Sequence, residues 1–272
     1  KMKMRKQIRM TAAVLLAAGM LAGCSNGAKE TETTSANDSK HTEIRVAAAA
    51  SLKNAFENEL IPMFEEQNPD ITVTGIYDSS GKLQTQIEEG LDADVFMSAA
   101  QKQMNALNDE GLIDTESITD LLENKIVLIV PSGNAAELKN FADIQEAASI
   151  ALGDPASVPA GQYAEEALTN LGIWDKIQDK VSFGSNVTEV LNQVAVSSAD
   201  AGIVYATDAA SMADKVEVVA EAPEGSLSKP VIYPVAVVKK SAHPQEAKTF
   251  EAFLKSDEAM SVFASYGFSA GS

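Results

Sequence analysis

Short apolar runs rich in Val, Ile and Ala alternate along this chain with longer segments in which apolar residues recur every three or four positions. The first kind of run predicts a strand, and the second predicts one buried face of a helix. Strands that alternate with helices favour parallel sheets covered by helices on both faces, because a helix returns the chain between parallel strands. The sequence therefore predicts an α/β fold, and its 272 residues suffice for one large domain or two of moderate size.

The runs that we expect to form strands lie at 44–50, 71–77, 93–98, 126–130, 149–152, 181–183, 201–205, 216–219 and 231–238. The run 126–130 is apolar throughout and ends at Pro131, which is typical of a parallel strand buried on both faces. Pro62 is expected to kink or interrupt the first helix, because proline has no N–H to donate. Gly90 and Gly172 are expected to end two later helices, since glycine readily adopts the left-handed conformation found there.

In the first strand-to-helix turn, four alanines at 47–50 precede Ser51, and large apolar residues then recur every four positions from Leu52 to Phe64. Ser51 is expected to cap this helix, because its hydroxyl can accept a hydrogen bond from a first-turn N–H. The open N–H groups of a helix N-terminus also attract anions. On its own, however, this stretch is more typical of an ordinary structural turn.

The same kind of turn recurs at three further places, at 79–81, 153–161 and 184–186. All four turns are rich in Ser, Gly and Ala and contain no Arg. In the last of them, Asn186 and Glu189 have the spacing of a capping box. Because ligands on α/β sheets bind beyond the carboxyl ends of the strands, the four turns are candidate parts of one binding site.

The charge of the chain restricts what such a site can bind. A formal net charge of -18 makes the protein a poor candidate for binding nucleic acid, whose phosphates require cationic neutralisation. A site for a small anion would have to overcome the repulsive field of the whole molecule. Lys53 and Lys82 lie near the turns but can point to solvent. Backbone and hydroxyl dipoles are therefore the expected donors.

The N-terminus has the pattern of an export signal. Residues 1–23 contain a basic stretch followed by an apolar run too short for an ordinary spanning helix. This run leads into Cys24, the single cysteine of the chain, which resembles the lipidated first residue of a bacterial lipoprotein. A plain secretory signal with an incidental cysteine is the alternative. The polar segment 24–42 is expected to be a flexible tether that holds the protein on the outer face of a bacterial membrane.

Other chemistries find little support. The two histidines, His41 and His243, have no partner at metal-ligand spacing, so no directly coordinated metal is expected. The segment 267–271 matches the nucleophile elbow G-x-S-x-G around Ser269, but the chain ends before the required helix. A surface hydrolase that uses Ser269 or a pair of acidic residues remains an alternative from a different class. Tyr205 is equally typical of a buried structural residue and of a ligand contact.

From about Glu43 to Phe268 the chain resembles the molybdate-binding proteins of ABC transporters, within the periplasmic-binding-protein group. The segments that carry the resemblance are VAAAASL at 46–52, SSGKL at 79–83 with ADVF at 93–96, GDP at 153–155 with VPAG at 158–161, and GIVY at 202–205 with Asp208-Ala209. The resemblance implies two lobes, each a mostly parallel sheet flanked by helices, with the ligand in the cleft. It places the first lobe at 43–124 plus 233–272 and the second at 125–232.

The resemblance also implies a set of contacts to the oxyanion, at Ser51, Ser80, Ala160, Val187 and Tyr205. The serines and the tyrosine would donate from hydroxyl groups, and Ala160 and Val187 from backbone N–H groups. Asp78 lies two residues before Ser80, and we expect its carboxylate to point away from the anion.

By the same resemblance, the protein is a monomeric, non-enzymatic component of an ABC importer. It has no cofactor, captures molybdate and tungstate as oxyanions, and delivers them to a membrane permease. A receptor for sulfate or another oxyanion remains the alternative, because hydrogen-bond donors alone do not define the size of a cavity.

Overall fold

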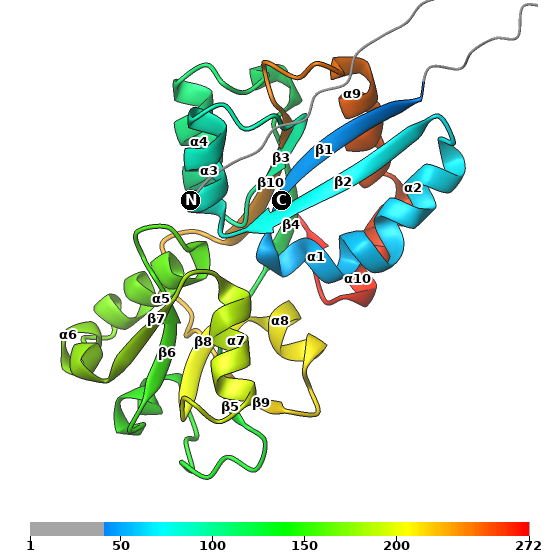
Figure 1. Ribbon diagram of the computed structural model, residues 1–272. Helices are drawn as coiled ribbons and strands as arrows, with labels where there is room; N and C mark the ends of the chain where they lie inside the picture. Colours follow the sequence, from blue (N-terminus) through cyan, green and yellow to red (C-terminus); the bar gives the residue numbers. More distant parts are fainter. Residues whose placement is uncertain (1–40, 272) are drawn as a thin grey trace, which may run out of the picture. The chain divides into compact units, whose positions relative to one another are not determined.

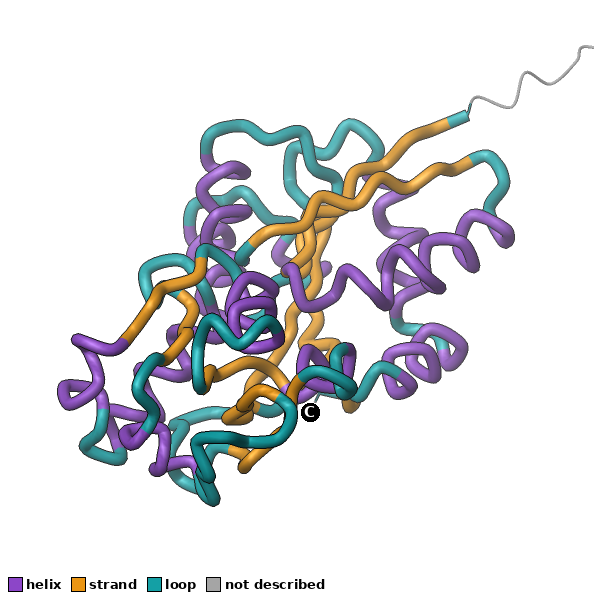
Figure 2. Tube along the Cα trace, turned by 60° about the horizontal axis from the view of Figure 1, so that its bottom comes forward, coloured by secondary structure: helices purple, strands orange, loops and turns teal. Residues whose placement is uncertain are grey.

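The computed structural model of the protein describes residues 41–271, so the predicted signal peptide, Cys24 and almost all of the predicted tether lie outside the described residues. Within this range the strands form a six-stranded and a five-stranded sheet (Figure 1). Figure 2 shows, from another side, helices beside both groups of strands. The prediction of an α/β fold with two helix-flanked sheets is confirmed. No helix in the described range is long and apolar enough to span a membrane.

The first sheet has the strand order β11-β4-β10-β3-β1-β2. Its strands are β1 (Thr42–Ala49), β2 (Ile71–Asp78), β3 (Val95–Met97), β4 (Thr119–Asn124), β10 (Val231–Val237) and β11 (Ser269–Ala270). The helices that follow these strands are α1 (Lys53–Ala55), α2 (Ile61–Gln67), α3 (Ser80–Glu88), α4 (Gln101–Asp109), α9 (Pro244–Leu254) and α10 (Asp257–Ser265). The first sheet is therefore built from two separate stretches of the chain.

Alternation along β1 buries side chains on both faces of the first sheet. Ala47 belongs to a cluster with Leu83 of α3 and Met104 of α4, so these two helices cover one face (Figure 1). The neighbouring Ala48 belongs to the larger cluster on the opposite face. That cluster contains Phe64 of α2, whose ring meets Phe250 of α9 edge to face at 4.9 Å between centroids. Burial on both faces explains why β1 reads as an almost continuous apolar run.

The second sheet has the strand order β7-β6-β8-β5-β9. Its strands are β5 (Ile126–Pro131), β6 (Ile150–Gly153), β7 (Val181–Gly184), β8 (Ala201–Tyr205) and β9 (Val216–Glu221). The helices beside it are α5 (Pro159–Asn170), α6 (Trp174–Ile177), α7 (Val187–Ala195) and α8 (Ala206–Ser211). Helices α5 and α7 both contact β6 and β8 at the middle of the sheet.

Both sheets are mixed rather than mostly parallel. In the first, β1 is parallel to β2 and β3, whereas β10 is antiparallel to β3 and β4. In the second, β6 is parallel to β7 and β8, whereas β5 is antiparallel to β8 and β9. The prediction that 126–130 forms a parallel strand is therefore wrong. Its apolar composition reports burial, and burial is shared by central antiparallel strands.

The chain passes between the two sheets at two places. Strand β4 ends at Asn124 and β5 begins at Ile126, so a single residue separates the sheets there. The return passage runs from β9 through residues 222–230 into β10. Strand β10 pairs with the first sheet from Val231 onward. The division of the strands between the two sheets agrees with the predicted lobes. The exact lobe boundaries remain a prediction.

The helical region 50–67 corrects two local predictions. A 3-10 turn, Ala50–Leu52, begins one residue before Ser51 and has no side-chain cap, so the assignment of Ser51 as the N-cap is wrong. Pro62 does not interrupt the region, which stays helical on both sides of it. A π-helical turn, Phe56–Leu60, lies directly before α2 instead. Such a widened turn accommodates the missing proline N–H within a continuous helix. At the ends of two other helices, Gly90 and Gly172 have φ of +100° and +69°, as predicted.

Candidate functional site

A small cavity with a volume of about 10 Å³ lies where the ends of strands from both sheets meet the starts of helices. The five residues predicted to contact an oxyanion all line it: Ser51, Ser80, Ala160, Val187 and Tyr205. The remaining lining residues are Ala49, Ala50, Ser79, Ala99, Val158 and Pro159, so no charged side chain faces the cavity. The structure thus brings the predicted residues together, and their role in binding stays a prediction.

Ser80 enters the cavity from the first turn of α3. The preceding residue, Ser79, is the N-cap, and its hydroxyl accepts from the N–H of Lys82 at 3.4 Å. Ser80 is fully buried, and its Oγ accepts a hydrogen bond from the N–H of Ala99 at 3.0 Å. Because a hydroxyl can accept and donate at once, Ser80 retains a proton for a ligand.

Ala99 itself lines the cavity and was not among the predicted contacts. It follows β3 within the small-residue run Ser98-Ala99-Ala100. This run is rich in Ser and Ala, like the four candidate turns. The same compositional signal in the sequence would have identified Ala99.

Ala160 and Val187 lie in the first turns of α5 and α7. N–H groups at these positions have no acceptor within their own helix, and no turn or cap bond in the described residues uses them. Gly161 allows α5 to start this close to β6, because a Cβ there would lie 2.0 Å from the carbonyl oxygen of Gly153. Both helices therefore present free N–H groups at the cavity.

The start of α7 is held by two side chains. The Asn186 side chain accepts from the N–H of Glu189 at 3.0 Å, as predicted for an N-cap. The Glu189 carboxylate accepts from the N–H of Ser185 at 2.5 Å, one residue before the position expected in a capping box. The hydrogen bond from Ser185 lowers the pKa of Glu189 below its usual range. The two side-chain bonds fix the direction in which Val187 presents its N–H.

Tyr205 ends β8 with its ring buried in the cavity wall. Its hydroxyl has no hydrogen-bond partner in the described residues. Burial raises the pKa of Tyr205 well above its ordinary value, so the hydroxyl keeps its proton. The ring of Tyr233 meets that of Tyr205 edge to face at 5.5 Å, without a hydrogen bond of good geometry between them. A buried donor without an acceptor is costly, and a ligand that accepts from it would remove that cost.

The hydroxyl of Ser51 lies 2.9 Å from the hydroxyl of Tyr233 on β10. This contact explains why the Ser51 side chain does not cap its own helix. Two nearby charges are paired with each other: Asp78 accepts from the N–H of Ser79 at 2.8 Å and forms an ion pair with Lys82 at 3.5 Å. The ammonium group of Lys53 lies 6.0 Å from the ring centroid of Tyr77. Asp78 does not line the cavity.

A second cavity of about 200 Å³ adjoins the first, and Ser51 lines both. Its wall includes Asp208, which is 6% exposed and accepts from the N–H of Tyr205 at 3.2 Å. Burial raises the pKa of Asp208 from 3.8 to about 7. A carboxyl group that is about half protonated near pH 7 adds less negative potential beside an anion than a fully ionised one.

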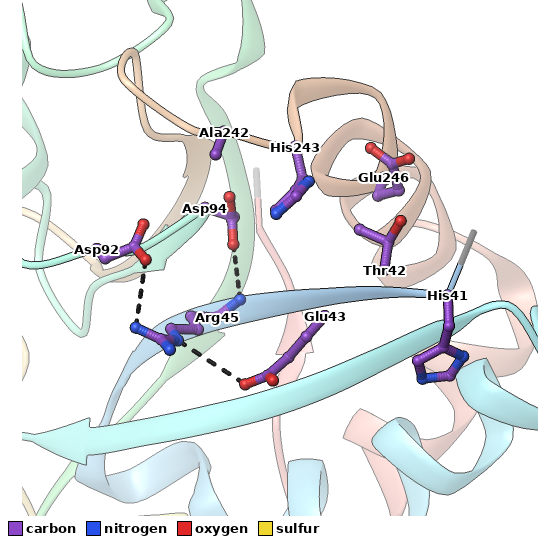
Figure 3. Close-up of a pocket in the computed structure, with 9 residues that line it drawn as sticks. All are labelled: His41, Thr42, Glu43, Arg45, Asp92, Asp94, Ala242, His243 and Glu246. Atoms are coloured by element: carbon purple, nitrogen blue, oxygen red, sulfur yellow. Dashed lines mark hydrogen bonds and ion pairs between the residues drawn. The ribbon is translucent and has the colours of Figure 1, made fainter. Parts of the chain in front are cut away.

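A third, larger pocket of about 450 Å³ lies at the start of β1, away from the turns (Figure 3). Three of its charged groups, Glu43, Arg45 and Asp92, contact one another. Arg45 reaches Asp92 at 3.2 Å and Glu43 at 3.8 Å, and Asp94 accepts from the N–H of Arg45 and the hydroxyl of Ser241. No group of His, Cys, Asp and Glu among residues 41–271 could hold a metal ion. This pocket therefore has the character of a structural ion-pair cluster.

The match to a nucleophile elbow has no structural counterpart. Ser269 forms part of the short edge strand β11, is exposed, and donates to the carbonyl of Glu123 at 3.4 Å. A nucleophile elbow requires a strand-to-helix turn, and no helix follows Ser269 in the described range.

Two α/β units that share one small cavity lined by neutral donors define a protein that binds a small solute. The chain belongs to the bacterial extracellular solute-binding protein family, whose model matches residues 44–269. Its description names solute binding outside the cell.

Three similar proteins sharpen the comparison. The chain is 42% identical over 267 residues to the putative ABC transporter substrate-binding lipoprotein YvgL of Bacillus subtilis, covering 98% of this chain and 100% of that protein. It is 40% identical to the molybdate-binding protein ModA of Haemophilus influenzae, covering 84% and 90% of the two chains. A solved substrate-binding domain of a putative molybdenum ABC transporter from Clostridium difficile is 38% identical, with a TM-score of 0.64 and coverage of 84% and 98%.

Proposed function

We propose that this protein captures molybdate, and also tungstate, in the cavity lined by Ser51, Ser80 and Tyr205, and delivers the oxyanion to the permease of an ABC importer. The observation that carries the proposal is the unpartnered hydroxyl of Tyr205, a buried donor facing a cavity with no charged lining. The names of the relatives from Haemophilus influenzae and Clostridium difficile support molybdate as the ligand.

Neutral donors suit this task. Hydroxyl groups from the first sheet and first-turn N–H groups from the second converge on one point, so an anion there would accept from both halves of the chain. A ligand that contacts both halves favours the arrangement in which they are close. The lining of small, neutral residues suits a compact inorganic anion better than a sugar or a peptide.

Calorimetric titration of the purified protein with molybdate, tungstate, sulfate and phosphate tests this proposal. We expect one site that binds molybdate and tungstate, with sulfate and phosphate much weaker. Tight sulfate binding without a response to molybdate would instead favour the alternative of a sulfate receptor.

We further propose that the protein is a monomer anchored to the outer face of the cytoplasmic membrane through lipid on Cys24. The signal-like pattern of 1–23 and the word lipoprotein in the name of the Bacillus subtilis relative support the anchor. A Cys24→Ala variant expressed in the native host should leave the membrane fraction. Continued membrane association of this variant would rule the anchor out.

A further inference from the structure

Asn124 occupies the last position of β4, where the chain leaves the first sheet. It is buried, and its two side-chain atoms have different partners. Its Oδ1 accepts from the N–H of Lys125 at 2.8 Å, whereas its Nδ2 donates to the hydroxyl of Tyr233 at 3.2 Å and to Thr207 at 2.9 Å. A flipped amide would set its NH₂ group against the N–H of Lys125, so the backbone assigns the orientation of this side chain.

The orientation of Asn124 in turn determines what Tyr233 does. Nδ2 can only donate, so the Tyr233 oxygen accepts there and must place its own proton elsewhere. In the described residues, the hydroxyl of Tyr233 is hydrogen-bonded to Asn124 Nδ2 and to the Oγ of Ser51, at 2.9 Å. Of these two partners, only the Oγ of Ser51 can accept the proton. Tyr233 is fully buried, so the reverse arrangement would leave its proton only the hydroxyl of Tyr205, with which it makes no hydrogen bond of good geometry.

Ser51 therefore accepts from Tyr233, and its own proton is left to point into the cavity that it lines. We propose that Asn124 and Tyr233 are positioning residues that fix the Ser51 hydroxyl as a donor to the bound oxyanion. The hydrogen bonds run in one direction, from the backbone at the passage between the sheets, through Asn124 and Tyr233, to Ser51. This inference rests on the proposed function, because it assigns a purpose to one donor of that site.

A double-mutant cycle on molybdate affinity tests the inference. Tyr233→Phe should weaken binding by about tenfold, the equivalent of one lost hydrogen bond. In a Ser51→Ala background the same change should alter affinity by less than about twofold, since no hydroxyl is left to orient. Tyr77→Phe, in a half-buried tyrosine of β2 outside the cavity lining, is the matched control and should leave affinity unchanged. A structural role for Tyr233 would instead give equal losses in both backgrounds and would overturn the proposal.

Asn124→Asp provides an independent arm. A carboxylate keeps the bond to the N–H of Lys125 but accepts from Tyr233, which reverses the chain and draws the Ser51 proton away from the cavity. Repulsion by the added charge acts equally with and without the Ser51 hydroxyl, so the comparison between the two backgrounds removes it. We expect the loss to be several-fold larger when Ser51 is present, and equal losses would overturn the proposal. Absence of molybdate binding by the unmodified protein would refute the proposed function itself, which separates the two failures.

Discussion

The backbone N–H of Ala99 donates a hydrogen bond of 3.0 Å to the Oγ of Ser80. Ala99 follows β3 and Ser80 begins α3, so this bond joins two of the strand-to-helix turns. Both atoms are buried. The hydroxyl of Ser80 thus serves the fold as an acceptor and offers its proton to the cavity, as Ser51 does through Tyr233.

Replacement of Ser80 by Ala should therefore have two effects. Loss of the donor should weaken molybdate binding by about tenfold or more, and the unpaired N–H of Ala99 should lower the free energy of unfolding by about 1–3 kcal/mol. Titration calorimetry and urea denaturation measure the two quantities.

Ser256→Ala is a matched control, because Ser256 caps α10 by accepting from Ala259 at 3.2 Å. It should cost about 0.5–2 kcal/mol of stability and leave affinity unchanged. Unchanged affinity in the Ser80 variant would remove Ser80 from the site.

Gly81 controls the approach of the first sheet to the second. Its N–H donates to the carbonyl of Ser157 at 2.9 Å, and a Cβ at this position would lie 2.4 Å from that oxygen. We expect Gly81→Ala to weaken molybdate binding at least tenfold, because α3 could no longer reach the loop before α5. Gly90→Ala, at the end of the same helix, should lower stability through its φ of +100° without changing affinity. An equal affinity loss in both variants would show that damage to α3 alone is responsible.

Asp208 should make both stability and binding depend on pH. Its pKa is raised to about 7 in the folded protein by burial and returns to its ordinary value of 3.8 on unfolding. The folded state therefore holds an extra proton between these values, so the free energy of unfolding should fall as pH rises from about 4 to about 7. Molybdate affinity should fall as pH rises through about 7, because the carboxyl beside the cavity becomes charged.

Asp208→Asn removes the titrating group but keeps an oxygen for the N–H of Tyr205. Its stability and affinity should lack the fall with rising pH that Asp208 causes in the unmodified protein. Denaturation and calorimetry at several pH values provide the comparison. The same slopes in both proteins would assign the dependence to another group.

Tyr205→Phe should separate stability from binding. The unpartnered hydroxyl costs the ligand-free protein the desolvation of a buried donor, so its removal should leave the melting temperature equal or higher. The same change should weaken molybdate binding by about tenfold, since a donor is lost. Thermal unfolding without ligand and titration with molybdate test both halves. A lower melting temperature with unchanged affinity would make Tyr205 a structural residue.

The sequence was informative where local chemistry decides the structure. Helix ends at Gly90 and Gly172 follow from the left-handed conformation that glycine adopts, and tertiary contacts do not override it. The small-residue turns meet at or beside one cavity, because the carboxyl ends of strands collect at one edge of a sheet. The individual contact residues, Val187 and Tyr205 among them, came from the family resemblance.

The sequence did not predict which strands pair with each other or which distant side chains form hydrogen bonds. The direction of β5 depends on which strands lie beside it, and its apolar composition reports burial alone. The segment Thr119–Asn124 was not predicted as a strand, because Asp, Glu and Asn are depleted in strands. Its pairing with β10 on one side and with β11 on the other determines its conformation. Ser51 has the composition of an N-cap, but a tyrosine 182 residues later takes its hydroxyl.

The most direct test of the account is the position of molybdenum in a crystal of this protein grown with molybdate, located by anomalous diffraction. We predict one peak in the cavity between Ser80 and Tyr205, with oxyanion oxygens at roughly 2.5–3.2 Å from their hydroxyl groups and from the N–H groups of Ala160 and Val187. A peak at another place, such as the ion-pair pocket around Arg45, would contradict it.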